Sequence, residues 1–376
     1  MSASSSQPGI LPNPNVSALP VYHAGMNIDL ARRLSGHDTI AALASNENPY
    51  GCSPRVMEAL GSSSFNPSRY SDAACTELRN ELSRFLDHPA DAIVIGNGSE
   101  EMVAAISRAF LVPGACALTV TPSFGLHEIE PLAAGARVKK VPMTPDMRFD
   151  IEALEAALAE APALFFLPAP SNPVGAALTG DELARLVAAT RPQTLFVLDE
   201  AYFEFMDEGL ADGMSLLRNG DLSTVVLRTF SKAYGLAGLR VGYAACSNPE
   251  IARIIAAAKT PFNVNAAAQI AAVAALADQA WMKNAVERTK SERARVAKEL
   301  TGLGVFVAPS HTNFLFFKID LQSSRTAEEL LSDGIIVKGW REAGYETWVR
   351  VTIGTAEEND RFLASLRRIL GMTGEK

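Results

Sequence analysis

Residues 92–111 read AIVIGNGSEEMVAAISRAFL, and this stretch indicates the fold class. Its first five residues are apolar or small, as in a strand that is buried on both faces. A turn containing two glycines follows, and the next twelve residues have the apolar spacing of a helix. A buried strand followed directly by a helix is the repeating unit of α/β proteins.

The same alternation continues along the chain. Further apolar runs are CALTV (116–120), ARVKKVPM (136–143), ALFFLPAPSNP (163–173), TLFVLDEAY (194–202), STVVLRTFS (223–231) and RVGYAACS (240–247). Helical patterns are CTELRNELSRFL (75–86), DIEALEAALAEA (150–161) and TGDELARLVAAT (179–190). This order predicts a mostly parallel sheet with helices on both faces.

The pattern changes after about residue 280. A long charged helix is expected over 281–303, and short apolar runs and two helices follow it in an α+β order. The sequence therefore predicts a flexible arm over 1–20, a large domain over 45–275, and a small domain made of 21–44 and 276–376. The Ala-rich run 266–277 is too short for a membrane span and predicts a buried helix.

Composition excludes several classes of protein. The chain has 376 residues, of which 48% are hydrophobic and 20% charged, and its formal net charge is -8. A nucleic-acid binder would need a basic face, so we expect no nucleic-acid partner. No long apolar segment or signal peptide is recognisable, which predicts a cytoplasmic protein without a membrane partner. The four cysteines and five histidines have no metal-ligand spacing, so we expect no metal.

Unusual residues follow four of the expected strands, where ligands of parallel sheets bind. The turn before Ser99 suits a phosphate at a helix N-terminus, or is merely a capped helix start. Asn172 is a ligand contact or part of a turn, and Asp199 is a catalytic carboxylate or a structural hydrogen-bond acceptor. Lys232, between Ser231 and small residues, is an active amine or a solvated lysine.

Taken together, these groups match the needs of a pyridoxal phosphate site. Lys232 would be the amine that forms a Schiff base with the cofactor aldehyde, its pKa lowered by nearby cations so that it also transfers protons. Asp199 would keep the pyridine nitrogen protonated, so that the ring accepts electrons. The remaining contacts would be Asn172 and Tyr202 at the phenolic oxygen, and Ser231 and Arg240 at the phosphate.

The blocks SNPVG (171–175), DEAYFEF (199–205) and RTFSKAYGLAGLRVGY (228–243) resemble the signatures of fold-type I pyridoxal-phosphate-dependent aminotransferases. Within that class II group the chain is most similar to the histidinol-phosphate aminotransferases. Further matching blocks, in family order from about residue 20 onward, are VYHAGM, ASNENPYGCSP, SRYSD, GNGSEE, TPSFGLH, PSHTNFLFF and WVRVTIGT. The resemblance implies a large domain with a mostly parallel seven-stranded sheet and a smaller α+β domain.

The resemblance also implies site residues and a homodimer with shared active sites. Tyr70 corresponds to the tyrosine that reaches the cofactor phosphate of the other subunit, and backbone amides of Ser99 and Glu100 bind that phosphate. Arg350 corresponds to the arginine that receives a substrate carboxylate or phosphate; a surface strand arginine is the alternative. Tyr22 and Asn48 are assigned to the substrate by their positions in the blocks.

Two positions depart from the family pattern. The residue that stacks on the cofactor ring is often tyrosine, and here it is Phe124, which keeps the stacking without the hydroxyl. Lys338 stands where many members have a second arginine, and it binds phosphate without the bidentate fork. Trp340 either walls an aromatic pocket or belongs to the core. These departures leave histidinol phosphate and aromatic amino acids such as phenylalanine and tyrosine both open as substrates.

The expected activity is a ping-pong transamination between histidinol phosphate and 2-oxoglutarate, with Lys232 and Asp199 as catalytic residues. An aromatic amino-acid aminotransferase is the alternative within the same chemistry. A decarboxylase of an amino-acid phosphate would release CO₂ and need no oxo-acid acceptor. A non-catalytic binding protein is the alternative that differs most from these enzymes. It does not explain why the complete set of cofactor residues is present.

Overall fold

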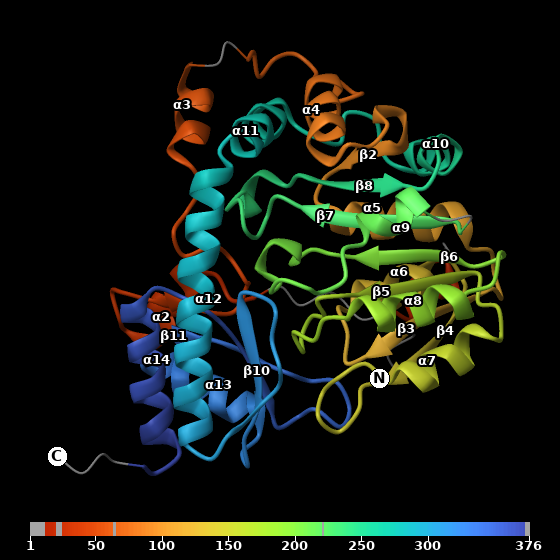
Figure 1. Cartoon of the computed structure of the whole chain (residues 1–376). Helices are drawn as coiled ribbons and strands as arrows, with labels where there is room; N and C mark the ends of the chain where they lie inside the picture. The colour runs from red at the N-terminus through yellow and green to blue at the C-terminus, as the bar shows by residue number, and fades with distance from the viewer. Residues whose placement is uncertain (1–11, 20–24, 63–64, 220–221, 373–376) are drawn as a thin grey trace, which may run out of the picture.

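The computed structural model describes residues 12–19, 25–62, 65–219 and 222–372. Its largest element is a seven-stranded sheet with the order β2-β8-β7-β6-β5-β3-β4 (Figure 1). The strands are β2 (Ile93–Gly96), β3 (Cys116–Thr121), β4 (Arg137–Pro142), β5 (Leu164–Pro168), β6 (Leu195–Asp199), β7 (Thr224–Thr229) and β8 (Gly242–Cys246). Each expected strand between residues 92 and 247 is present.

The sheet is mostly parallel, as predicted. β4, β3, β5, β6 and β7 pair in parallel, and only β8 runs antiparallel to its neighbours β7 and β2. Gly242 at the start of β8 therefore lies in register with both Gly96 and Thr229, the last residues of β2 and β7. The carboxyl ends of the parallel strands and the start of β8 thus meet at one edge of the sheet.

Helices cover both faces of this sheet because its central strands are apolar on both sides. In β6, Phe196 and Leu198 pack on one core while Leu195 and Val197 pack on the core of the opposite face. Each such buried side chain contributes roughly 1.5–3 kcal/mol to folding. The helices of this part are α3 (Pro54–Ser62), α4 (Thr76–Leu86), α5 (Ser99–Phe110), α6 (Leu126–Ala133), α7 (Ile151–Leu158), α8 (Gly180–Ala189), α9 (Met214–Asn219), α10 (Pro249–Ala258) and α11 (Ala266–Leu276), with 3₁₀ turns at Ala90–Ala92, Phe203–Phe205 and Ala237–Leu239.

A second, antiparallel sheet has the order β12-β13-β10-β9. Its strands are β9 (Phe306–Val307), β10 (Phe314–Lys318), β12 (Lys338–Gly339) and β13 (Trp348–Thr352), and the accompanying helices are α2 (Ile28–Ser35), α12 (Gln279–Gly302), α13 (Ser323–Ser332) and α14 (Ala356–Ile369). The short strand β1 (Ala41–Ala42) pairs in parallel with β11 (Ile335–Ile336). The segment before residue 45 thus joins the C-terminal part, and the exact domain limits stay a prediction.

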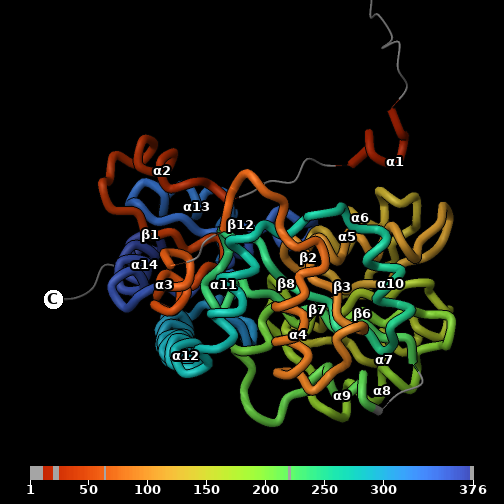
Figure 2. Tube along the Cα trace, turned by 90° about the horizontal axis from the view of Figure 1, so that it is seen from above, coloured from red at the N-terminus to blue at the C-terminus, as the bar shows by residue number. Residues whose placement is uncertain are grey.

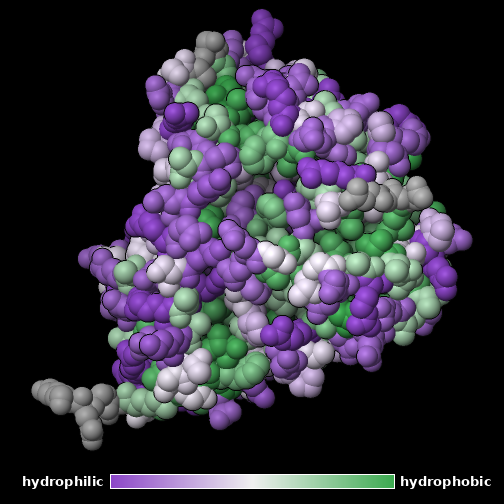
Figure 3. Space-filling model, viewed as in Figure 1, coloured by the Kyte–Doolittle hydropathy of each residue, from purple (hydrophilic) through white to green (hydrophobic). Residues whose placement is uncertain are grey.

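The long helix α12 connects the two parts. It runs from the region of α3 and α11 down beside α14 (Figure 1), and hydrophilic side chains cover it on the face shown in Figure 3. Within the expected N-terminal arm the described residues form the four-residue helix α1 (Pro14–Ser17), which contacts α6 beside the large sheet (Figure 2).

Two further searches cover only the described ranges. In those ranges no helix is long and apolar enough to cross a membrane. Likewise, no group of three or more His, Cys, Asp or Glu side chains in the described chain is placed to hold a metal ion.

Candidate active site

A cavity of about 1180 Å³ lies between the carboxyl edge of the large sheet and the small antiparallel sheet. Its walls come from strand ends of the large sheet, from α2, α6 and α13, and from β12 and β13. Twelve of the residues that the sequence singles out line it: Ser99, Glu100, Phe124, Asn172, Asp199, Tyr202, Ser231, Lys232, Arg240, Lys338, Trp340 and Arg350. Residues far apart in the chain thus face one space.

Lys232 lies three residues beyond β7, and its ammonium donates to the backbone carbonyl of Ser45 at 3.1 Å. Burial, followed by the positive charges of Arg350 and Arg240, lowers the pKa of Lys232 to about 8. The sequence predicts this direction from the cations alone, but burial is the largest cause. A pKa near 8 gives a useful fraction of neutral, nucleophilic amine near physiological pH.

Asp199 ends β6 and is 6% exposed, and its two carboxylate oxygens have different partners. One oxygen accepts from the backbone N–H of Ala201 at 3.1 Å, and the other lies 3.0 Å from Nε2 of His127. His127 is fully buried, stacks on Phe166 and meets Phe124 edge to face. The carboxylate is therefore held in one orientation at the floor of the cavity.

An anion cradle lies where β2 passes into α5. Gly98 precedes α5 with φ +80 and brings no capping side chain, so the first N–H groups of the helix face the cavity region. A Cβ on Gly98 would lie 2.5 Å from Nη2 of Arg240, and one on Gly242 would lie 2.6 Å from the backbone nitrogen of Ser99. Only glycine fits at both positions. Because neither position carries a Cβ, the backbone at the start of α5 and the Arg240 guanidinium lie close enough together to bind one small anion.

The other members of the cradle are held by the loop after β7. Arg240 donates to the carbonyl of Ala237 at 3.1 Å and forms an ion pair with Glu100 at 3.0 Å. The backbone N–H of Ser231 donates to the hydroxyl of Thr229, which lies 3.0 Å from the Ser231 hydroxyl. The carboxylate of Glu100 is half exposed and neutralises part of the Arg240 charge while its backbone stays at the helix start.

Asn172 and Tyr202 are both fixed by partners that the sequence does not reveal. The amide oxygen of Asn172 accepts from Nη1 of Arg350 at 2.7 Å, and an asparagine keeps two N–H donors when its oxygen is occupied. The hydroxyl of Tyr202 accepts from the amide of Asn46 at 2.8 Å. Both side chains thus have defined orientations at the cavity.

Lys338 and Arg350 form a cationic pair on the opposite wall. They are direct cross-strand partners in the antiparallel pairing of β12 with β13, so both side chains lie on one face of the small sheet. Burial, then the charges of Arg350 and Arg341, lowers the pKa of Lys338 to about 8. Such a pair attracts an anion that bears more than one negative charge.

Two residues assigned from the sequence lie outside the cavity, and a third is not among the residues that the structure describes. Asn48 does not line the cavity; its amide donates to the carbonyl of Ala233 at 2.9 Å and so steadies the loop that carries Lys232. Tyr70 is 84% exposed outside the cavity and stacks on Phe262, with ring centroids 4.5 Å apart. Tyr22 lies outside the described residues.

The sequence analysis missed His127, Asn46 and Glu342. It considered histidines only as metal ligands, although His127 follows Phe124 by three positions at the start of α6, which is enough to place it beside the strand ends. Asn46 and Glu342 are brought in by contacts between distant segments, for which the sequence carries no local signal.

Comparisons with known proteins agree with this geometry. Residues 38–366 match the family model described as aminotransferase class I and II. The chain is 41% identical over 350 residues to histidinol-phosphate aminotransferase 1 of Mesorhizobium japonicum, covering 93% of this chain and 95% of that protein. It is 40% identical over 355 residues to histidinol-phosphate aminotransferase 3 of Rhizobium meliloti, with coverages of 94% and 96%.

A solved structure extends the likeness to three dimensions. The crystal structure of the Sinorhizobium meliloti histidinol-phosphate aminotransferase in complex with pyridoxal-5'-phosphate has a TM-score of 0.88 and 28% identity, covering 98% of this chain and 99% of that chain. The expected fold-type I architecture is thereby confirmed. The chain belongs to the class I and II aminotransferases and, among them, to the histidinol-phosphate aminotransferase family.

Proposed function

We propose that this aminotransferase uses pyridoxal phosphate to transfer the amino group of histidinol phosphate to 2-oxoglutarate. The observation that carries the substrate assignment is the cross-strand pair of Lys338 and Arg350 on the cavity wall opposite Lys232. Two adjacent cations suit the dianionic phosphate of histidinol phosphate better than the single carboxylate of an aromatic amino acid. The names of relatives with 41% and 40% identity support the same substrate.

The residues present fit the cofactor. Because Gly98 and Gly242 have no Cβ, Arg240 and the start of β8 lie directly against the first residues of α5, where helix N–H groups and a guanidinium can bind a phosphate. Lys232, half-buried and with its pKa lowered to about 8, would bind the cofactor aldehyde, and the buried carboxylate of Asp199 at a strand end would face the pyridine nitrogen. When bound, pyridoxal phosphate supplies an electron-accepting ring that makes the proton on the amine-bearing carbon removable.

The chain's own residues then have separate tasks. Asp199, oriented by His127, would hold a proton at the pyridine nitrogen, and Phe124 would stack on the ring. Lys232 would bind the cofactor through Nζ and would afterwards carry the proton between the two carbons that exchange it, because it lines the cavity and its pKa is lowered to about 8. Arg350 and Lys338 bind the anionic end of the donor and so orient the amine.

A substrate screen tests the proposal. Holoenzyme is mixed with histidinol phosphate, phenylalanine or tyrosine, and the change of the visible cofactor band gives each half-reaction. We expect the highest kcat/KM for histidinol phosphate and no CO₂ release. A higher kcat/KM for either aromatic amino acid, or CO₂ release without need of an oxo acid, would overturn the substrate assignment.

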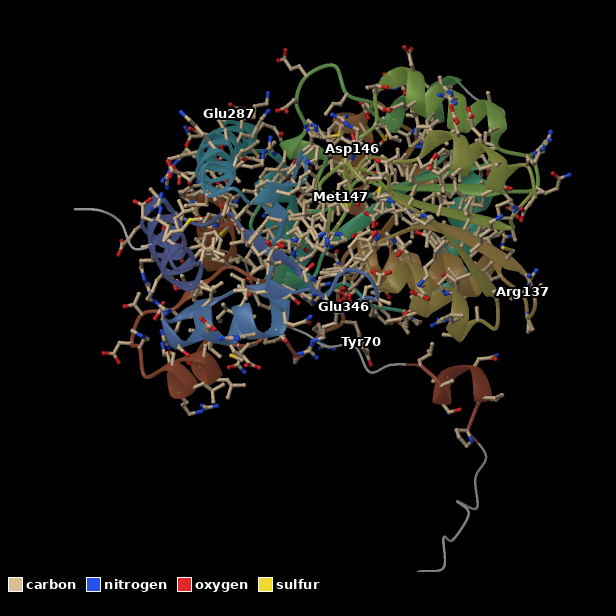
Figure 4. The ribbon with its side chains drawn as sticks, turned by 90° about the horizontal axis from the view of Figure 1, so that it is seen from below. Tyr70, Arg137, Asp146, Met147, Glu287 and Glu346 are labelled. Atoms are coloured by element: carbon tan, nitrogen blue, oxygen red, sulfur yellow. The ribbon has the colours of Figure 1, made fainter. Side chains whose placement is uncertain are left out.

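We also propose a cytoplasmic homodimer in which Tyr70 reaches the cavity of the partner. The rings of Tyr70 (labelled in Figure 4) and Phe262 are both exposed to solvent. Exposed apolar surface of this kind is unfavourable in water, and contact with a second copy of the chain would bury it. The four free cysteines support a reducing compartment. Light scattering should give the dimer mass, and mixing a Tyr70→Ala protein with a Lys232→Ala protein should restore part of the activity that each lacks.

A further inference from the structure

The loop between β12 and β13, residues 340–347, has the sequence WREAGYET, and its first three residues line the cavity. Hydrogen bonds and a ring contact hold this loop to α13 and to the small sheet. The N–H of Trp340 donates to the carbonyl of Trp348 at 2.9 Å, and the hydroxyl of Ser323 donates to the carbonyl of Trp340 at 2.8 Å. The indole of Trp340 meets Phe316 of β10 edge to face.

One side chain of this loop also reaches the large sheet. The carboxylate of Glu342 accepts from the hydroxyl of Thr121, the last residue of β3, at 2.6 Å. Its other oxygen accepts from Nε1 of Trp340 at 3.2 Å. Because a carboxylate has two acceptor oxygens, one group joins the indole of the cavity wall to a strand end of the large sheet.

Nearby charges favour this arrangement. The ammonium of Lys140 lies 4.0 Å from Glu342 and also pairs with Glu128 of α6 at 3.0 Å. The hydroxyl of Tyr345 approaches the carbonyl of Thr121 at 3.4 Å, a second contact between loop and strand end. Glu342 is half-buried and lines the cavity, so bulk water screens its hydrogen bonds only in part.

We propose that Glu342 is a positioning residue that sets the affinity of the cavity for the side-chain end of the amino donor. It fixes the loop and the Trp340 indole relative to the strand ends that carry the reacting groups. Lys338 lies two residues before Trp340 on the same strand-loop unit, so a loosened loop also shifts the cationic pair that receives the anion. The inference rests on the aminotransferase function proposed above.

The test compares holoenzymes of Glu342→Gln, Thr121→Val and the double variant. Glutamine is uncharged, so any hydrogen bonds that it makes to the Thr121 hydroxyl and the Trp340 indole lose the charge-assisted part of their strength. Losing a charge-assisted hydrogen bond corresponds to about tenfold in an equilibrium constant. We therefore expect KM for histidinol phosphate to rise about tenfold in Glu342→Gln, with kcat and the visible cofactor band changed less than twofold.

The double variant separates this contact from general destabilisation. If Thr121 and Glu342 act through one bond, the double variant has a KM no higher than that of Glu342→Gln. The matched control is Glu346→Gln on the same loop (Glu346 is labelled in Figure 4), whose carboxylate accepts from the N–H of Gly344 at 3.0 Å. It should leave KM unchanged.

Three results would overturn the inference: an unchanged KM in Glu342→Gln, fully multiplicative effects in the double variant, or an equal rise of KM in Glu346→Gln. If wild-type enzyme does not use histidinol phosphate, the substrate assignment fails by itself. The same KM ratios are then measured with the amino donor that the wild type does use, so the role of Glu342 is decided separately. Should Glu342→Gln not fold, Thr121→Val carries the test, with an expected KM rise of about threefold.

Discussion

Replacing His127 by phenylalanine removes its hydrogen bonds, to Asp199 and to the Ser123 hydroxyl, while keeping a planar ring at that position. The bond to Asp199 is 3.0 Å long, and the two side chains are 0% and 6% exposed, so water cannot replace it readily. A hydrogen bond to a charged group in such surroundings contributes about 1.5–3 kcal/mol. With about 1.4 kcal/mol for each factor of ten, kcat should fall roughly ten- to hundredfold if the carboxylate is no longer held at the pyridine nitrogen.

The assay is steady-state kinetics of the holoenzyme beside urea unfolding. His127→Gln, whose amide can still donate to Asp199, should recover part of the lost kcat. His88 provides a matched control, because it is also buried and Nε2 lies 2.9 Å from a backbone carbonyl, that of Cys246, away from the cavity. His88→Phe should lower the free energy of unfolding without lowering kcat. A His127→Phe enzyme with kcat within twofold of wild type would refute the positioning role.

Further predictions concern the anion cradle, the cationic pair of Lys338 and Arg350, and the Lys232 amine. Gly242→Ala should raise the Kd for pyridoxal phosphate at least about tenfold in a cofactor titration, since its Cβ would lie 2.6 Å from the nitrogen of Ser99. Arg350→Lys loses the bidentate fork and should raise KM for histidinol phosphate about tenfold or more in steady-state assays, with a smaller effect on stability. The pKa of Lys232 is lowered to about 8, so its amine is mostly protonated below that pH; stopped-flow attachment of cofactor to apoprotein should accelerate as pH rises, with a midpoint near 8. A midpoint near the ordinary lysine value would contradict the burial of this amine.

Much of the large sheet could be predicted from the sequence because its strands are apolar on both faces and alternate with periodic helices. β5 and β6, with Phe165 and Phe196 buried side by side, are clear cases. The reversed direction of β8 could not be predicted, because it depends on the connection after Lys232 rather than on the composition of RVGYAACS. Likewise, pairing of β1 with β11 joins residues almost 300 positions apart.

The candidate site was partly predictable for a related reason. Lys232, Asp199 and Asn172 each follow an apolar run directly, so the strand ends bring them to one edge. Contacts between the small sheet and the large sheet leave no local pattern in the sequence, because the contacting residues are far apart in the chain. The hydrogen bond from Thr121 to Glu342, across 221 positions, is the plainest example. Asn48 is the opposite case. The family resemblance identified the right segment of the chain, but the Asn48 side chain lies outside the cavity and supports the loop that carries Lys232.

The most direct test of the central claim is to identify the residue that carries the cofactor. Holoenzyme is treated with borohydride, which fixes the cofactor covalently to its amine, and the digested protein is sequenced by mass spectrometry. We expect the added mass on Lys232 alone, and no added mass in a Lys232→Ala protein prepared in the same way. Added mass on Lys338, on another lysine, or on none would contradict the assignment of this cavity as the active site.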